Sequence, residues 1–306
     1  MRDLLQHIVD GVSLGAIYAL IALGYTMVYG VLKLINFAHG DVFMIGSMVG
    51  WYASARWTGE ARNPSVLGAI AVTLLAMVVC GLLGFVIERL AYRPLRNAPR
   101  INSLITAIGV SFFLEYGGQY LFGPNPRSFG ILPHRAAMDI GGLSIGYVDV
   151  VTIVISVVLM VVLQRIVFHT RIGTAMRAVS WNPSVAALMG VNIDFVVSFT
   201  FVLGSVLAAA AGILYASKYP SVHPLMGLMP GLKAFVAAVL GGIGNVPGAM
   251  LGGLLLGLAE QLVSGYGSSS WRDAVAFSIL ILILLVKPAG LLGRTDAEKV
   301  EWQGRC

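Results

Sequence analysis

Long apolar runs alternate with short polar stretches along this chain, and the length of the runs sets the first expectation. A helix needs about 20 apolar residues to cross a bilayer, and on that measure the pattern predicts eight crossings. They lie near residues 8–31, 42–57, 65–87, 103–122, 148–168, 195–216, 246–264 and 272–287. A shorter apolar stretch at 232–243 makes a ninth if it also crosses. The pattern therefore predicts an all-α, polytopic membrane helical bundle that forms one domain, 1–306.

Glycine and polar residues interrupt the apolar pattern at two places, 34–46 and 241–253. Irregular backbone at membrane depth is tolerated only inside protein or beside water. Interrupted hydrophobic segments in corresponding halves of a chain are typical of transporter pathways. We therefore expect interrupted helices at both places, and a possible internal repeat that is either parallel or inverted.

Composition and charge support the membrane interpretation. Hydrophobic residues make up 58% of the 306 residues and charged residues 11%, with a net charge of +6, whereas soluble domains carry about 25% charged residues. Eleven of the 20 basic residues fall in 88–101, 164–194 and the C-terminal tail. Lys and Arg accumulate in cytoplasmic loops, so we place 169–194, the tail 295–306 and the C-terminus in the cytoplasm. The Gly- and Pro-rich loop 123–147 is then periplasmic, and the positive charge indicates membrane orientation and no nucleic-acid partner.

The polar residues of the two interruptions are candidate pathway residues. Asn36, His39 and Asp41 lie in the first interruption and Asn245 in the second. One interpretation makes them part of a translocation pathway or its inner gate. The other places the first three at a helix end in the cytoplasmic interface, with Asp41 at the start of the next helix, where the helix dipole favours a carboxylate.

Two carboxylates fall inside predicted crossings. Glu115 is deep in its run and is a candidate pathway residue or one half of an internal ion pair, because intramembrane carboxylates are costly. Glu260 is near the outer end of its run, so we expect an interfacial position. No second ligand stands at metal-binding spacing from His39, and the chain carries no phosphate-loop, nucleophile-elbow or zinc-protease motif. We predict no metal, no cofactor and no enzyme activity; active transport takes its energy from a partner or an ion gradient.

The connection 169–194 contains a short helix with signals at both ends. Asn182 suits the N-cap, Pro183 the first turn and Gly190 the position after the last turn. The residues between them include an apolar face. Such a helix either lies on the membrane or inserts into the groove of a partner.

Five motifs carry a family resemblance. They are GVSLGAIYALIALGYTMVYGVLKLINFAHGDVFMIG at 11–46, YRPLRNAPR at 92–100, GTAMRAVSWNPSVAALMGVN at 173–192, LKAFVAAVLGGIGNVPGAMLGGLLLGLAE at 232–260 and KPAGLLGR at 287–294. Together they cover nearly the whole chain. The sequence resembles the bacterial high-affinity branched-chain amino acid permeases, the H-type inner-membrane subunits of the Liv ABC importer.

This resemblance implies a multi-pass protein of the inner membrane that works in a complex. Its implied partners are a second, M-type permease, two cytoplasmic ATPase subunits and a periplasmic amino-acid-binding protein. The segment 173–192 resembles the ATPase-coupling region of the family. The positions there that the resemblance marks as structural or contact residues are Gly173, Arg177, Asn182, Ala187 and Gly190.

Several functions remain open at this point. Related permeases serve urea, short amides or other amino acids, and selectivity is expected to reside largely in the binding protein. An ion-coupled carrier or passive facilitator would use Glu115 or Asp41 to handle protons. A membrane-embedded enzyme would use His39 with Asp41, although no nucleophile accompanies them.

Overall fold

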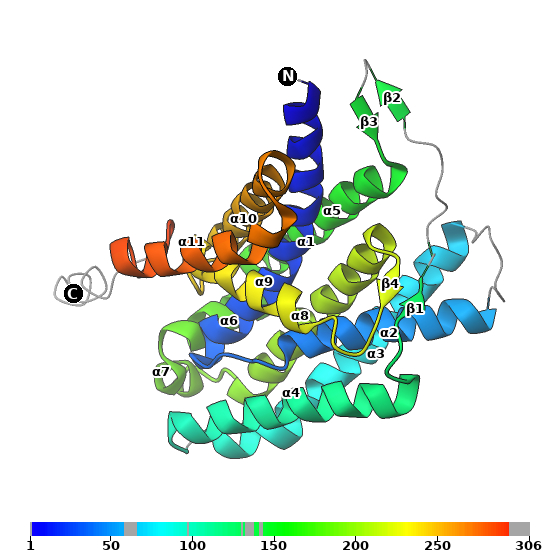
Figure 1. The fold of residues 1–306 in the computed structure, drawn as a ribbon. Helices are drawn as coiled ribbons and strands as arrows, with labels where there is room; N and C mark the ends of the chain where they lie inside the picture. Colours follow the sequence, from blue (N-terminus) through cyan, green and yellow to red (C-terminus); the bar gives the residue numbers. More distant parts are fainter. Residues whose placement is uncertain are drawn as a thin grey trace.

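The computed structural model describes residues 2–57, 66–96, 98–129, 131, 138–140 and 143–293. The predicted tail 295–306 and part of the loop 123–147 lie outside these residues. In the described part the chain is almost entirely helical (Figure 1). The α-helices are α1 (Arg2–Leu32), α2 (His39–Trp57), α3 (Val66–Ile87), α4 (Arg100–Phe122), α5 (Tyr147–His169), α6 (Arg171–Trp181), α7 (Pro183–Leu188), α8 (Ile193–Lys218), α9 (Leu228–Gly241), α10 (Val246–Tyr266) and α11 (Arg272–Val286).

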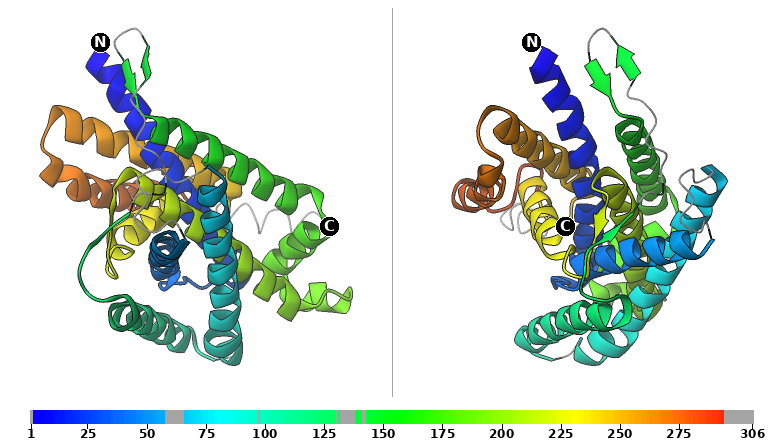
Figure 2. Two further views of the ribbon diagram at one scale, coloured as in Figure 1. Left: turned by 90° about the vertical axis from the view of Figure 1, so that its right-hand side faces the viewer. Right: turned by 45° about the vertical axis from the view of Figure 1, so that its right-hand side comes forward.

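Short irregular helices and strands complete the described structure. The π-helix η1 (Glu88–Tyr92) and the 3-10 helix η2 (Arg93–Leu95) extend α3, and the 3-10 helix η3 (Ser269–Trp271) precedes α11. Strand β1 (Arg127–Ser128) pairs antiparallel with β4 (Ser221–Val222). Strands β2 (Met138–Ile140) and β3 (Leu143–Ile145) form a hairpin beside the start of α1 (Figures 1 and 2).

All eight predicted crossings coincide with helices. Six spans of the described chain are long and apolar enough to cross a membrane: α1, α3 with η1 and η2, α5, α8, α10, and Ser269–Val286, which joins η3 to α11. The remaining two, α2 and α4, are 19 and 23 residues long and less apolar than those six. The apolar stretch 232–243 falls mostly in α9, whose 14 residues are fewer than the roughly 20 that a crossing requires.

Helix α1 forms the centre of the bundle. It packs against α5, α8, α9 and α10 (Figure 2). Of its most apolar stretch of 18 residues, 94% is buried, whereas the share is 11% for Ser269–Val286. Glycine allows the closest of these contacts: a Cβ atom on Gly15 would lie 2.8 Å from the Cα atom of Leu254 in α10. Small residues at such positions let membrane helices approach backbone to backbone. The outer helices instead present apolar side chains to the surroundings, as a bilayer requires.

Both predicted interruptions are present, but each is shorter than its predicted range. The first is 33–38, where Lys33 takes a left-handed φ of 57° between α1 and α2. The second is 242–245, between α9 and α10. His39 and Asp41 therefore belong to the first turn of α2. The two breaks lie close together, because Lys33 of the first and Gly244 of the second line one cavity, and Ile35 and Ile243 line another.

Candidate functional site

A small cavity lies between α1, α2, α4 and α9. Its volume is about 190 Å³, below the roughly 300–1,000 Å³ of common small-molecule pockets. Its polar lining consists of Tyr25, Asp41, Ser111 and Glu115, and its remaining walls are glycine and apolar side chains of the same helices and of Phe37. The rim is exposed at Phe112, so the cavity sits at the surface of the isolated chain.

Two carboxylates reach this cavity. Asp41 is buried and accepts a hydrogen bond from the Ser111 hydroxyl of α4. Glu115 follows Ser111 by four residues, and residues spaced by four share one face of a helix. The structure thus brings Asp41 and Glu115, which sequence analysis singled out separately, to one cavity. Carboxylates buried within a membrane bundle are typical of substrate and ion pathways.

Asn36 and His39 lie near this cavity without lining it. The Asn36 side chain accepts a 2.9 Å hydrogen bond from the Tyr92 hydroxyl. The His39 ring packs edge-on against Tyr25, with 4.7 Å between ring centroids, and its Nε2 atom has no hydrogen-bond partner in the described part of the chain. Both side chains are buried at or just before the start of α2. This is a helix end, while its position relative to the cytoplasmic interface stays a prediction.

Asn245 lies away from this cavity. It caps α10 by accepting a 3.1 Å hydrogen bond from the Gly248 N–H, and its amide donates to the Leu292 carbonyl at 2.6 Å. It also lines a separate cavity of about 500 Å³ at the end of the bundle that carries α6. The geometry therefore gives Asn245 the contacts of a helix cap that also fastens the chain beyond α11.

A second group of buried charges joins α1, α9, α10 and α11. Lys233 donates to Glu260 at 2.7 Å and pairs with Asp273 at 2.7 Å, while the Tyr18 hydroxyl donates to the other Glu260 oxygen at 2.8 Å. Glu260 is 4% exposed, so it is buried among the helices; the interfacial position expected for it is a depth in the membrane and stays a prediction. Its partner Lys233 stands inside a short apolar stretch, and a lone charge there was a signal that sequence analysis missed.

The predicted short helix is α7, and both of its ends are fixed. Asn182 accepts a hydrogen bond from the Val185 N–H at 3.2 Å. At the other end Gly190 has a φ of +83° and donates to Ala187 at 3.0 Å, and Val191 donates to Ala186 at 3.0 Å. This pair of hydrogen bonds is the Schellman arrangement, which places glycine after the last turn.

One face of α7 is apolar and exposed. Leu188 is 87% exposed and Met189 79% exposed, and Val185 and Trp181 are exposed beside them. Ala187 is exposed on the same short helix. Apolar side chains that gather at the end of a bundle in this way indicate a contact surface.

The other two residues of the predicted coupling set fasten α6 to α5. Gly173 is buried against the carbonyl groups of Ile166 and Val167, which leave no space for a Cβ atom. Arg177 donates to the Val167 carbonyl and lies 5.6 Å from the ring centroid of Phe168. Gly173 and Arg177 therefore make internal contacts, whereas Ala187 belongs to α7, and Asn182 and Gly190 fix its two ends.

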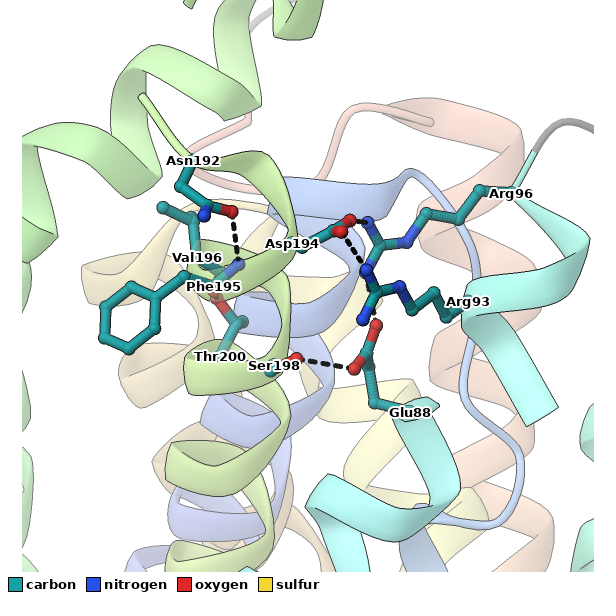
Figure 3. Close-up of polar contacts among 9 residues, drawn as sticks. All are labelled: Glu88, Arg93, Arg96, Asn192, Asp194, Phe195, Val196, Ser198 and Thr200. Carbon is teal, nitrogen blue, oxygen red and sulfur yellow. Dashed lines mark hydrogen bonds and ion pairs between the residues drawn. The ribbon is translucent and has the colours of Figure 1, made fainter. Parts of the chain in front are cut away.

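A charged cluster that sequence analysis missed lies where α8 begins (Figure 3). Asp194 pairs with both Arg93 and Arg96, and Arg96 also pairs with Glu88. The second Glu88 oxygen accepts from the Ser198 hydroxyl at 2.6 Å. In the sequence, the two arginines contributed to the predicted membrane orientation and to the motif at 92–100, but their pairing with Asp194 was not predicted. Glu88, a carboxylate directly after an apolar run, was the signal available for this cluster.

Comparison with known proteins gives one family over almost the full chain. The family described as branched-chain amino acid transport system / permease component matches residues 7–284. The high-affinity branched-chain amino acid transport system permease proteins LivH of Salmonella typhimurium and of Escherichia coli K12 are 42% and 43% identical to this chain, over 97% of both sequences in each case. The permease protein BraD of Pseudomonas aeruginosa is 40% identical over 97% of this chain and 98% of its own.

Proposed function

Because the chain belongs to the branched-chain amino acid transport permease family, we propose that it is the membrane-spanning subunit of an ATP-binding-cassette importer for branched-chain amino acids. Identity of 40–43% along almost the full length of three relatives named as such permeases is the observation that carries this proposal. Permease components are transport subunits. In this proposal the energy for uptake comes from ATP hydrolysis by partner ATPases.

We place the ATPase contact at α7. Its two fixed ends make it a rigid short element, and Leu188 and Met189 offer apolar surface for a partner's groove. Docking buries this surface, which the isolated chain leaves in contact with water. The basic residues near this end support a cytoplasmic location by the positive-inside rule, and we propose the same side for the C-terminus.

The cavity at Asp41 and Glu115 belongs, in this proposal, to the translocation pathway. Its rim residue Phe112 is exposed, so an intramembrane cavity with two carboxylates would face lipid unless another subunit covers it. A second permease is the covering partner. The apolar walls from α4 and α9 suit the aliphatic side chain of a branched-chain amino acid, and the carboxylates suit the α-ammonium group of the same molecule.

The opposite end of the bundle is periplasmic in this assignment. It carries the described part of the loop 123–147, with β1 joined to β4 and β2 joined to β3. A periplasmic amino-acid-binding protein would deliver substrate there. The complex then contains two permeases in the inner membrane, two ATPases on its cytoplasmic side and the binding protein on its periplasmic side.

Uptake by the reconstituted complex tests the proposal. Vesicles that hold the two permeases and two ATPases, with binding protein and labelled leucine outside and ATP inside, should accumulate leucine in the presence of an uncoupler. Unlabelled isoleucine and valine should compete, and urea should not. Uptake that needs no ATP and collapses with the uncoupler would instead establish an ion-coupled carrier. Competition by urea alone would assign a different substrate.

A further inference from the structure

The segment 88–96 contacts two parts of the bundle, one next to α7 and one next to the Asp41 cavity. It comprises η1, η2 and Arg96, and we refer to it as the bridge segment. Part of it is a π-helix, a rare form found frequently at functional sites. On one side it binds the start of α8, and on the other it binds the break between α1 and α2.

The contact with α8 lies close to α7, the proposed ATPase contact. Only residues 189–192 separate α7 from α8, and Gly190 and Val191 are hydrogen-bonded back to α7. Asn192 caps α8 through the Phe195 N–H at 3.0 Å (Figure 3). A displacement of α7 therefore reaches the first turn of α8, where Asp194 is located.

Asp194 joins that turn to the bridge segment. It pairs with Arg93, and its other oxygen accepts from Arg96 at 2.5 Å (Figure 3). Arg96 also holds the fully buried Glu88. A protein is strongly destabilised when a buried carboxylate loses its partner, so Glu88 keeps Arg96 in place. Asp194, with 45% of its side chain exposed, is the more exposed partner.

The opposite side of the bridge segment leads to the cavity by two routes. Tyr92 binds Asn36 at 2.9 Å, and both side chains are buried; Asn36 precedes α2, whose first turn holds Asp41. The chain after the bridge segment continues into α4, which carries Ser111, and Ser111 binds Asp41. Both routes therefore end at the same carboxylate.

We propose that Arg93, Arg96 and Asp194 are positioning residues that transmit movement of α7 to the Asp41 cavity through the bridge segment. This inference rests on the proposed function, because it needs α7 to be the element that the ATPases move. Other ion pairs of the described chain serve different elements: the pair of Lys218 with Asp149, 2.6 Å apart, joins α8 to α5 at the far end of the bundle.

The test removes the charge of Asp194 and keeps its shape. In the full complex, Asp194→Asn should lower leucine uptake per ATP hydrolysed by about fivefold or more, the lower end of common coupling effects. The melting temperature and the ATPase affinity should stay at the parent values, since partly exposed ion pairs contribute little to stability. Asp194→Glu, which keeps the charge, should retain most of the uptake. Asp149→Asn is the matched control and should leave uptake per ATP unchanged.

Two results would overturn the inference. One is parental uptake per ATP in Asp194→Asn. The other is a loss of melting temperature, ATPase binding and uptake together, which would make Asp194 a structural residue only. Failure of the proposed function is recognised separately, because the parent complex would then show no ATP-driven leucine uptake.

Discussion

Leu188 offers the sharpest test of the docking surface on α7. Its side chain is 87% exposed in the chain, so Leu188→Ala should leave the fold intact and act only on the complex. The change removes three carbon atoms, and burial contributes about 0.8 kcal/mol per methylene. If docking buries the exposed fraction, the loss is about 2 kcal/mol. At about 1.4 kcal/mol per tenfold, the ATPase should bind roughly 30-fold more weakly.

The assay is a binding titration of the purified ATPase subunit against the permease pair in lipid nanodiscs. Leu121→Ala is the matched control, because Leu121 is 74% exposed and does not belong to α7. It is the last residue but one of α4. The control should bind as the parent does. Equal ATPase affinity for Leu188→Ala and Leu121→Ala would refute the assignment of α7 as the docking element.

Two further predictions concern the bundle interior. Glu260→Gln removes one of the two carboxylates that pair with the buried Lys233. It should destabilise the chain, but by less than the about 3–5 kcal/mol lost when a buried charge is left without any partner, because Asp273 still pairs with Lys233. Thermal unfolding measures this, and the double change Lys233→Met with Glu260→Leu should recover much of the loss. A melting temperature unchanged by Glu260→Gln alone would contradict the pairing. Asp41→Asn should reduce leucine uptake with unchanged ATPase affinity, whereas an uptake rate equal to the parent's would remove Asp41 from the pathway.

The helices and the two breaks could be predicted because their causes are local. Apolar length indicates a membrane helix, and glycine with Asn245 marks the end of one helix and the start of the next. The short helix α7 was equally readable, since Asn182 and Gly190 fix its ends through hydrogen bonds within a few residues. The predicted breaks were too long because polar residues in a first turn, such as Asp41, look like loop residues in sequence.

The contacts between distant residues could not be predicted in the same way. Glu260 is 27 residues from Lys233, and the hydrogen bond from Tyr18 crosses 242 positions. Arg96 meets Asp194 across 98 positions. A single sequence shows that such charges are costly in a membrane but not which partner compensates each one. Only the packing of α1 against α10, and of the bridge segment against α8, determines the pairs.

In the proposed mechanism this bundle moves substrate only when ATPases bound at α7 drive it. The most direct measurement is the initial rate of labelled leucine entry into vesicles that contain the permease pair, with and without the two ATPase subunits, at equal permease content. We expect ATP-dependent entry with the ATPases and no entry above that of empty vesicles without them. Entry at the full rate from the permease pair alone would contradict it.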